Sequence, residues 1–196
     1  MQLSISDYYK KYGRISTQSA AALEVLAQSI SYSKGYLIHR EGQVSRSVYL
    51  IVKGVARVFY YRNGNDVTNQ FFTEGEAMAA MESLYTGKPS FYNIELLEDC
   101  DLVQVDYAAM EKLYDQYHDL ESCGRLLAIE CYLEENERNR FFQMLTAKDR
   151  YLNLLKTKPE ILQRVKLGHI EGHVTSIRGD NIKKINQKKG AIEMTI

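Results

Sequence analysis

Residues 48–75 read VYLIVKGVARVFYYRNGNDVTNQFFTEG, and this stretch decides the fold. Three runs rich in β-branched and aromatic residues, at 48–52, 55–61 and 67–72, are separated by Gly54 and by Asn63-Gly64. Such runs are typical of short strands. An Asn-Gly pair predicts a tight hairpin turn because both residues tolerate positive φ. We therefore expect consecutive antiparallel strands here.

The same pattern continues on both sides of this stretch. Further β-rich runs cover residues 36–40, 91–97 and 102–105, and glycines at 42, 54, 64 and 75 recur every ten to twelve residues. Short strands with regular turn signals predict a barrel or a sandwich.

Helical patterns flank the β-rich region. Apolar residues at helical spacing predict a helix over 19–30, and after Asp106 we expect a short helix over 107–117 and a long one over 120–145. Along the long helix Leu120, Leu127 and Phe141 recur at multiples of seven, with Cys131 on a neighbouring row. This stripe could pair two subunits. A helix lying on its own barrel is the alternative, because residues 134–140 are almost entirely polar.

The composition is that of a globular protein, with 45% hydrophobic residues. No segment approaches the roughly 18 apolar residues of a membrane span, so we expect a cytoplasmic protein.

The three cysteines show no CxxC spacing and predict reduced thiols. The net charge of the chain is zero, but the charges are unevenly distributed along it: residues 148–196 carry 11 of the 25 basic and 5 of the 25 acidic residues. This basic tail, about +6, suggests a polyanionic partner.

A boundary is expected near Thr146. Thr146 and Asp149 form a capping-box-like start for a helix to about Lys156, and Pro159 opens another short helix. From Leu167 the chain is basic and helical at most.

The order of these elements resembles the Crp/Fnr family of bacterial regulators. The family's barrel signatures and the entry to its helix-turn-helix domain resemble these strings: Glu41-Gly42, residues 49–54, residues 72–76, residues 146–151, Lys158-Pro159 and residues 167–170. The resemblance implies an α+β chain: a cyclic-nucleotide-binding-like jelly-roll (double-stranded β-helix) barrel over 1–117, a dimerisation helix over 118–145, and a helix-turn-helix-like domain over 146–196 that is degenerate after about 170. It also implies a homodimer, with Leu120, Leu127, Cys131 and Phe141 at the interface.

The ligand cassette departs from the cyclic-nucleotide pattern. Family members that bind cyclic nucleotides use a Glu and an Arg of the cassette, and Ala80 and Ser90 occupy those positions here. Glu82 could replace the Glu if the alignment shifts by two residues. The resemblance predicts a ligand-binding set, for an unknown small-molecule effector other than cAMP, of Gly75, Glu76, Ala80, Met81, Glu82, Ser90 and Tyr92.

The segment that corresponds to the helix-turn-helix also departs from the family pattern. Gly172 stands in the first helix of the helix-turn-helix, and Gly179-Asp180 interrupts the recognition helix. Basic residues that could still contact DNA phosphates are Arg178, Lys183, Lys184 and Lys188. A basic tail without a DNA role is the alternative.

The sequence shows no catalytic signature, and we expect neither an enzyme nor a cofactor. His169 and His173 lie four residues apart without a suitably spaced third ligand, so no metal site is predicted. The favoured interpretation is a ligand-responsive dimeric transcription regulator of Crp/Fnr type. The alternative is a sensor or binding module that has lost sequence-specific DNA recognition.

Overall fold

The computed structural model describes residues 3–175 of the chain. The helices are α1 (Ile5–Lys10), α2 (Thr17–Leu26), α3 (Met81–Thr86), α4 (Tyr107–Tyr114), α5 (His118–Met144), α6 (Ala147–Thr157), α7 (Ile161–Arg164) and α8 (Leu167–Thr175). The strands are β1 (Gln28–Tyr32), β2 (Leu37–His39), β3 (Ser47–Lys53), β4 (Ala56–Arg62), β5 (Asn65–Phe72), β6 (Ala77–Met78), β7 (Asn93–Leu96) and β8 (Cys100–Asp106). The predicted DNA contacts, Arg178, Lys183, Lys184 and Lys188, lie outside the described residues.

Eight strands form two four-stranded antiparallel sheets, in the orders β1-β8-β3-β6 and β2-β7-β4-β5. The expected hairpin is β4–β5, and its turn residues have positive φ, 51° at Asn63 and 77° at Gly64. Between the sheets lies an apolar layer that includes Ile51, Leu96 and Leu102, each at most 1% exposed. The two-sheet barrel predicted from the strand pattern is confirmed.

The first predicted helix is wrong at its C-terminal end. Helix α2 stops at Leu26, and Ile30 lies in strand β1, opposite Leu102 of β8. Pairing with β8 satisfies the backbone of residues 28–32, and this tertiary gain overrides the local helical spacing. The sequence analysis also did not predict α1, α3 or β6.

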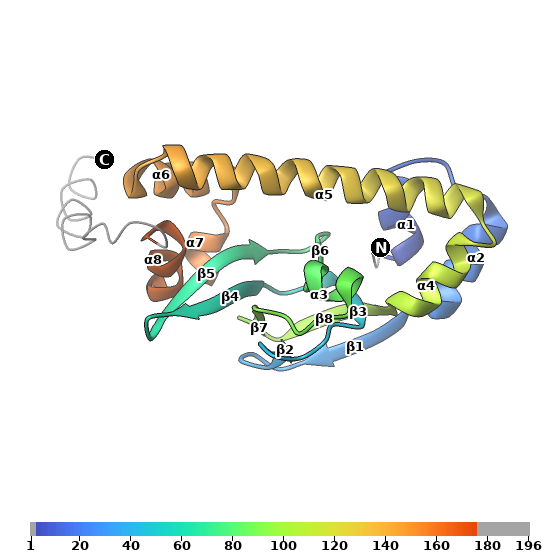
Figure 1. Ribbon diagram of the computed structural model, residues 1–196, viewed down its shortest axis with the longest axis horizontal. Coiled ribbons are helices and arrows are strands. Elements are labelled where there is room, and N and C mark those ends of the chain that lie inside the picture. Colours follow the sequence, from blue (N-terminus) through green and yellow to red (C-terminus); the bar gives the residue numbers. More distant parts are fainter. Residues whose placement is uncertain (1–2, 176–196) are drawn as a thin grey trace.

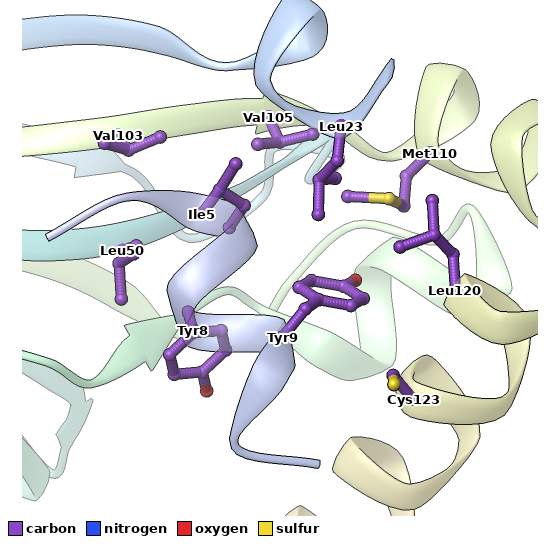
Figure 2. Packing of buried hydrophobic residues seen from close by; sticks show 10 residues of the cluster. All are labelled: Ile5, Tyr8, Tyr9, Leu23, Leu50, Val103, Val105, Met110, Leu120 and Cys123. Carbon is purple, nitrogen blue, oxygen red and sulfur yellow. The ribbon is translucent and has the colours of Figure 1, made fainter. Parts of the chain in front are cut away.

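One end of the barrel is closed by helices α1, α2, α4 and α5 (Figure 1). Ile5 and Tyr9 of α1 pack with Leu23, Met110 and Leu120 in a single cluster (Figure 2). Ser4 caps α1 by accepting a hydrogen bond from the Asp7 amide. The N-terminal segment is therefore an integral part of the hydrophobic core at this end of the barrel.

Helix α5 runs along the length of the molecule beside the barrel, and the chain then folds back through α6, α7 and α8 (Figure 1). The predicted start at Thr146 is present: its hydroxyl accepts a hydrogen bond from the Asp149 amide. Ile161 and Ile170 are buried against Phe71 of the barrel in one cluster. Up to Thr175, the C-terminal segment thus shares a core with the barrel.

Charged contacts reinforce this docking. The Arg164 guanidinium contacts Glu74 at 2.7 Å and Glu98 at 2.6 Å. The Glu74 pKa is lowered to about 2, chiefly because its carboxylate accepts hydrogen bonds from Arg164. Gly172 of α8 lies so close to β5 that a Cβ there would stand 2.9 Å from the Asp66 carbonyl oxygen. The absence of a side chain at Gly172 therefore permits the close approach of α8 to β5.

Candidate ligand-binding site

A cavity of about 640 Å³ lies between the barrel, α1 and α5. This volume falls within the usual range for small-molecule sites. All seven residues of the predicted ligand-binding set line its wall: Gly75, Glu76, Ala80, Met81, Glu82, Ser90 and Tyr92. The structure therefore brings the predicted set together around one space.

Gly75 and Glu76 form the turn that enters the cassette. Gly75 has a φ of 84°, which favours glycine, and the Glu76 carboxylate accepts a 2.7 Å hydrogen bond from the Thr73 amide. The same carboxylate pairs with the Lys158 ammonium of the C-terminal segment at 2.6 Å. Glu76 thus joins the cavity wall to the segment that follows α5.

The two family anchor positions carry no charge. Ala80 is 7% exposed and precedes helix α3, which begins at Met81. The Ser90 hydroxyl accepts a 2.9 Å hydrogen bond from the Tyr92 amide and donates at 3.2 Å to the Tyr92 carbonyl. Because this local turn engages the hydroxyl, Ser90 is a structural residue here and a poor replacement for an arginine.

Tyrosines form part of the wall, and those of the N-terminal segment were not predicted from the sequence. Tyr8 and Tyr9 of α1 and Tyr12, which follows this helix, line the cavity, and the Tyr9 hydroxyl lies 2.5 Å from that of Tyr114. Burial raises the pKa of Tyr114 to about 12 and that of Tyr9 further. These phenols are therefore neutral at physiological pH. The sequence signal that could have indicated them is their close spacing: Tyr9 follows Tyr8 directly, and Tyr12 lies four residues after Tyr8.

Arg138 of α5 is a second functional candidate that the sequence analysis missed. Its side chain is 16% exposed, lines the cavity, and donates hydrogen bonds to Gln70 of β5 and Glu135. The guanidinium thus ties the C-terminal half of α5 to the barrel.

Helix α5 turns the predicted dimer residues toward its own protomer. Leu120 is fully buried in the core, Leu127 packs against that core, Cys131 lines the large cavity, and Phe141 lines a smaller one of about 280 Å³. Leu120 in particular leaves no side-chain surface for a partner. Packing on the barrel accounts for the spacing of this row, because burial against the barrel and pairing with a partner produce the same periodicity.

The opposite face of α5 carries an unpartnered apolar row. Leu126, Ile129 and Leu133 are 42%, 46% and 60% exposed. Together with Ser122 and Asn136 they follow alternate spacings of four and three residues. This is the a/d spacing of a coiled coil, with Leu126 and Leu133 at a and Ile129 at d.

The described residues hold no group of three or more side chains suited to a metal ion. His173 is instead half-buried, with its Nδ1 atom 3.2 Å from the Thr68 carbonyl oxygen and its ring near Phe71. Burial lowers its pKa to about 4. Within residues 3–175, no helix combines the length and the hydrophobicity that crossing a membrane requires.

Comparison with known proteins agrees with this geometry. Residues 29–117 match the family model described as the cyclic nucleotide-binding domain. No curated protein matches the sequence at a significant level.

Solved structures similar to this chain include regulators and an isolated domain. The c-di-GMP responsive global regulator CLP of Xanthomonas campestris is 16% identical, with a TM-score of 0.64 over 89% of this chain and 93% of that one. The catabolite activator protein of Thermus thermophilus is 17% identical, with a TM-score of 0.56 over 92% and 84%. A cyclic nucleotide-binding domain from Methylobacillus flagellatus is 17% identical, with a TM-score of 0.61 over 72% and 80%. At these identities the likeness shows the fold alone: the two sheets and the long helix that follows them have the fold of cyclic nucleotide-binding domains, and residues 29–117 match the model of that family.

Proposed function

We propose that the protein is a ligand-responsive, dimeric transcription regulator of Crp/Fnr type whose effector is not a cyclic nucleotide. One observation carries the proposal. The inner face of α5 walls the cavity, while its outer face bears Leu126, Ile129 and Leu133 without a partner. A single rigid element therefore joins the effector site to the surface that would pair two subunits.

The effector enters the cavity between the barrel and α5. A cyclic nucleotide needs a cation for its phosphate and a carboxylate for its ribose. Ser90 and Ala80 supply neither, and the Ser90 hydroxyl is already engaged by Tyr92. We therefore expect a ligand held mainly by the apolar and aromatic wall.

The dimer forms through the outer face of α5. Three residues separate an a position from the next d position and four separate d from the next a, so Leu126 and Leu133 fall at a and Ile129 falls at d. This choice of residues does not itself select two strands, and the dimer rests on the exposed row together with the family resemblance. Asn136 falls at the next d position, where a buried polar pair would cost stability. A two-fold axis along α5 would place the two C-terminal segments symmetrically, as palindromic DNA requires.

DNA contacts come from the basic C-terminal segment. Arg178, Lys183, Lys184 and Lys188 are the proposed phosphate contacts, in the part of the chain that carries the excess positive charge. The similarity to CLP and to the catabolite activator protein supports this assignment, since it extends over about nine-tenths of the chain.

The second candidate function is a sensor that has lost sequence-specific DNA recognition. Its support is the docking of α8, the expected first helix of the helix-turn-helix, against β5 through Gly172. A helix held there is less free to present a following recognition helix to DNA.

Selection of duplex DNA by the full chain, across a salt series, separates the two. A regulator enriches a palindromic site and still binds it near physiological salt. The Lys183→Ala/Lys184→Ala variant then loses affinity and has a shallower salt dependence. Weak binding without sequence preference that disappears with salt would establish the sensor-only function.

A further inference from the structure

We propose that the cavity beside α5 takes a hydrophobic organic cation, such as an aromatic amine or a quaternary ammonium or phosphonium compound. This inference rests on the proposed function, because it names the ligand class of the same cavity. Its basis is the combination of a tyrosine-containing wall with carboxylates that form no ion pair among the described residues.

An aromatic corner at one end of the cavity already holds a cation. The Tyr8 and Tyr12 rings meet edge to face, with centroids 5.6 Å apart. The Lys11 ammonium stands 5.0 Å from the Tyr8 centroid and donates a 3.2 Å hydrogen bond to the Gly75 carbonyl. A tyrosine face attracts a cation electrostatically, and the attraction grows when water is excluded. Lys11 thus occupies a position that suits a cationic ligand.

Carboxylates outnumber basic groups around the wall. The acidic lining residues are Glu76, Glu82, Glu130, Glu134 and Glu135, against Lys11 and Arg138. Lys158 neutralises Glu76, and Arg138 pairs with Glu135. Glu82, Glu130 and Glu134 form no ion pair within residues 3–175.

Glu130 and Glu134 lie one turn apart on α5, next to the aromatic corner. Their charges act on Tyr12, and the Glu134 pKa is raised by burial and by the nearby Glu130 and Glu76 carboxylates. A bound cation would relieve this repulsion, whereas an anion would increase it. The surroundings therefore favour positive charge in the ligand.

The test uses two probes of the same shape and opposite charge, tetraphenylphosphonium and tetraphenylborate, with cAMP as a third. Binding to the full chain is measured by calorimetry at physiological salt. We expect the phosphonium to bind at least about tenfold more tightly than the borate, because each unpaired carboxylate attracts one probe and repels the other.

Three variants locate the effect. Lys11→Met removes the internal competitor and should raise the phosphonium affinity several-fold. Glu130→Gln/Glu134→Gln should lower it about tenfold. Glu137→Gln is the matched control, since it removes a carboxylate from the same helix outside this cavity, and it should leave the affinity within about twofold.

Tighter binding of tetraphenylborate, lost in Lys11→Met, would overturn the inference, because Lys11 would then be an anion anchor. That result would leave an effector site in place and the proposed function standing. Tighter binding of cAMP would overturn the inference and also the exclusion of a cyclic nucleotide from the proposed function. Failure of both tetraphenyl probes to bind also overturns the cation class. The oligomeric state and the DNA selection test the proposed function independently of either outcome.

Discussion

Substituting alanine at the two glycines of α8 should change stability in opposite directions. A Cβ at Gly172 would lie 2.9 Å from the Asp66 carbonyl oxygen, which is backbone of β5 and cannot rotate away. At Gly168, four residues earlier in the same helix, nothing lies within 4 Å of the added carbon. The pair therefore separates packing against β5 from helix propensity.

The magnitudes follow from these contacts. Alanine is favoured over glycine within a helix by up to about 1 kcal/mol, and by less near the helix start. Gly168→Ala should thus raise the free energy of unfolding by about 0.5 kcal/mol. At Gly172 the helix must shift by several tenths of an ångström, and overpacking of this kind costs about 1–3 kcal/mol. The net expectation for Gly172→Ala is a loss of about 1 kcal/mol.

Urea denaturation of both variants and of the unaltered chain measures these differences. Hydrogen exchange of the backbone amides of α8 and β5 shows where in the chain these differences arise. The protection of these amides should fall in Gly172→Ala and not in Gly168→Ala. Stabilisation by both substitutions would refute the close approach of α8 to β5, and with it the shared core of the barrel and the C-terminal segment.

Three further predictions concern other contacts. Ile161→Ala removes a fully buried side chain and should lower the free energy of unfolding by about 2–4 kcal/mol, as measured by urea denaturation. Leu152→Ala, at a 49% exposed position, should lower it by less than about 1 kcal/mol. Equal losses would contradict the buried cluster. Asn136→Ile should raise the thermal stability of the dimer and admit higher oligomers, as light scattering would show; a weaker dimer would refute its d position. Because the folded pKa of His173 is about 4, below its ordinary 6.5, its contribution to stability is complete above pH 6.5 and is lost as pH falls toward 4. His173→Phe should flatten the stability profile in that window, and an unchanged slope would assign the titration elsewhere.

The barrel was predictable because its signals are local. Strand runs, corner glycines and Asn63-Gly64 each report on neighbouring residues, and the observed strands follow them. The cassette residues were found through the family resemblance, and all of them reach one cavity. The end of α2 was missed because β1 is defined by its distant partner β8.

The other failures share a cause, since they depend on which neighbour a face meets. Both rows of α5, the one through Leu120 and Leu127 and the one through Leu126 and Ile129, have helical spacing. Only the packing of the first row on the barrel shows which row stays open. The contribution of α1 and of Arg138 to the cavity likewise arises from tertiary contacts between segments far apart in the chain.

The most direct test of the account is the oligomeric state of the full chain with its α5 face altered, measured by sedimentation equilibrium. The account predicts a dimer for the unaltered chain and for Asn139→Lys, an exposed position of α5 outside the row. Leu126→Lys/Leu133→Lys should be a folded monomer, because both leucines are exposed in the protomer. A monomeric unaltered chain, or a dimer that survives the double substitution, would contradict the central claim that α5 joins the effector cavity to a subunit interface.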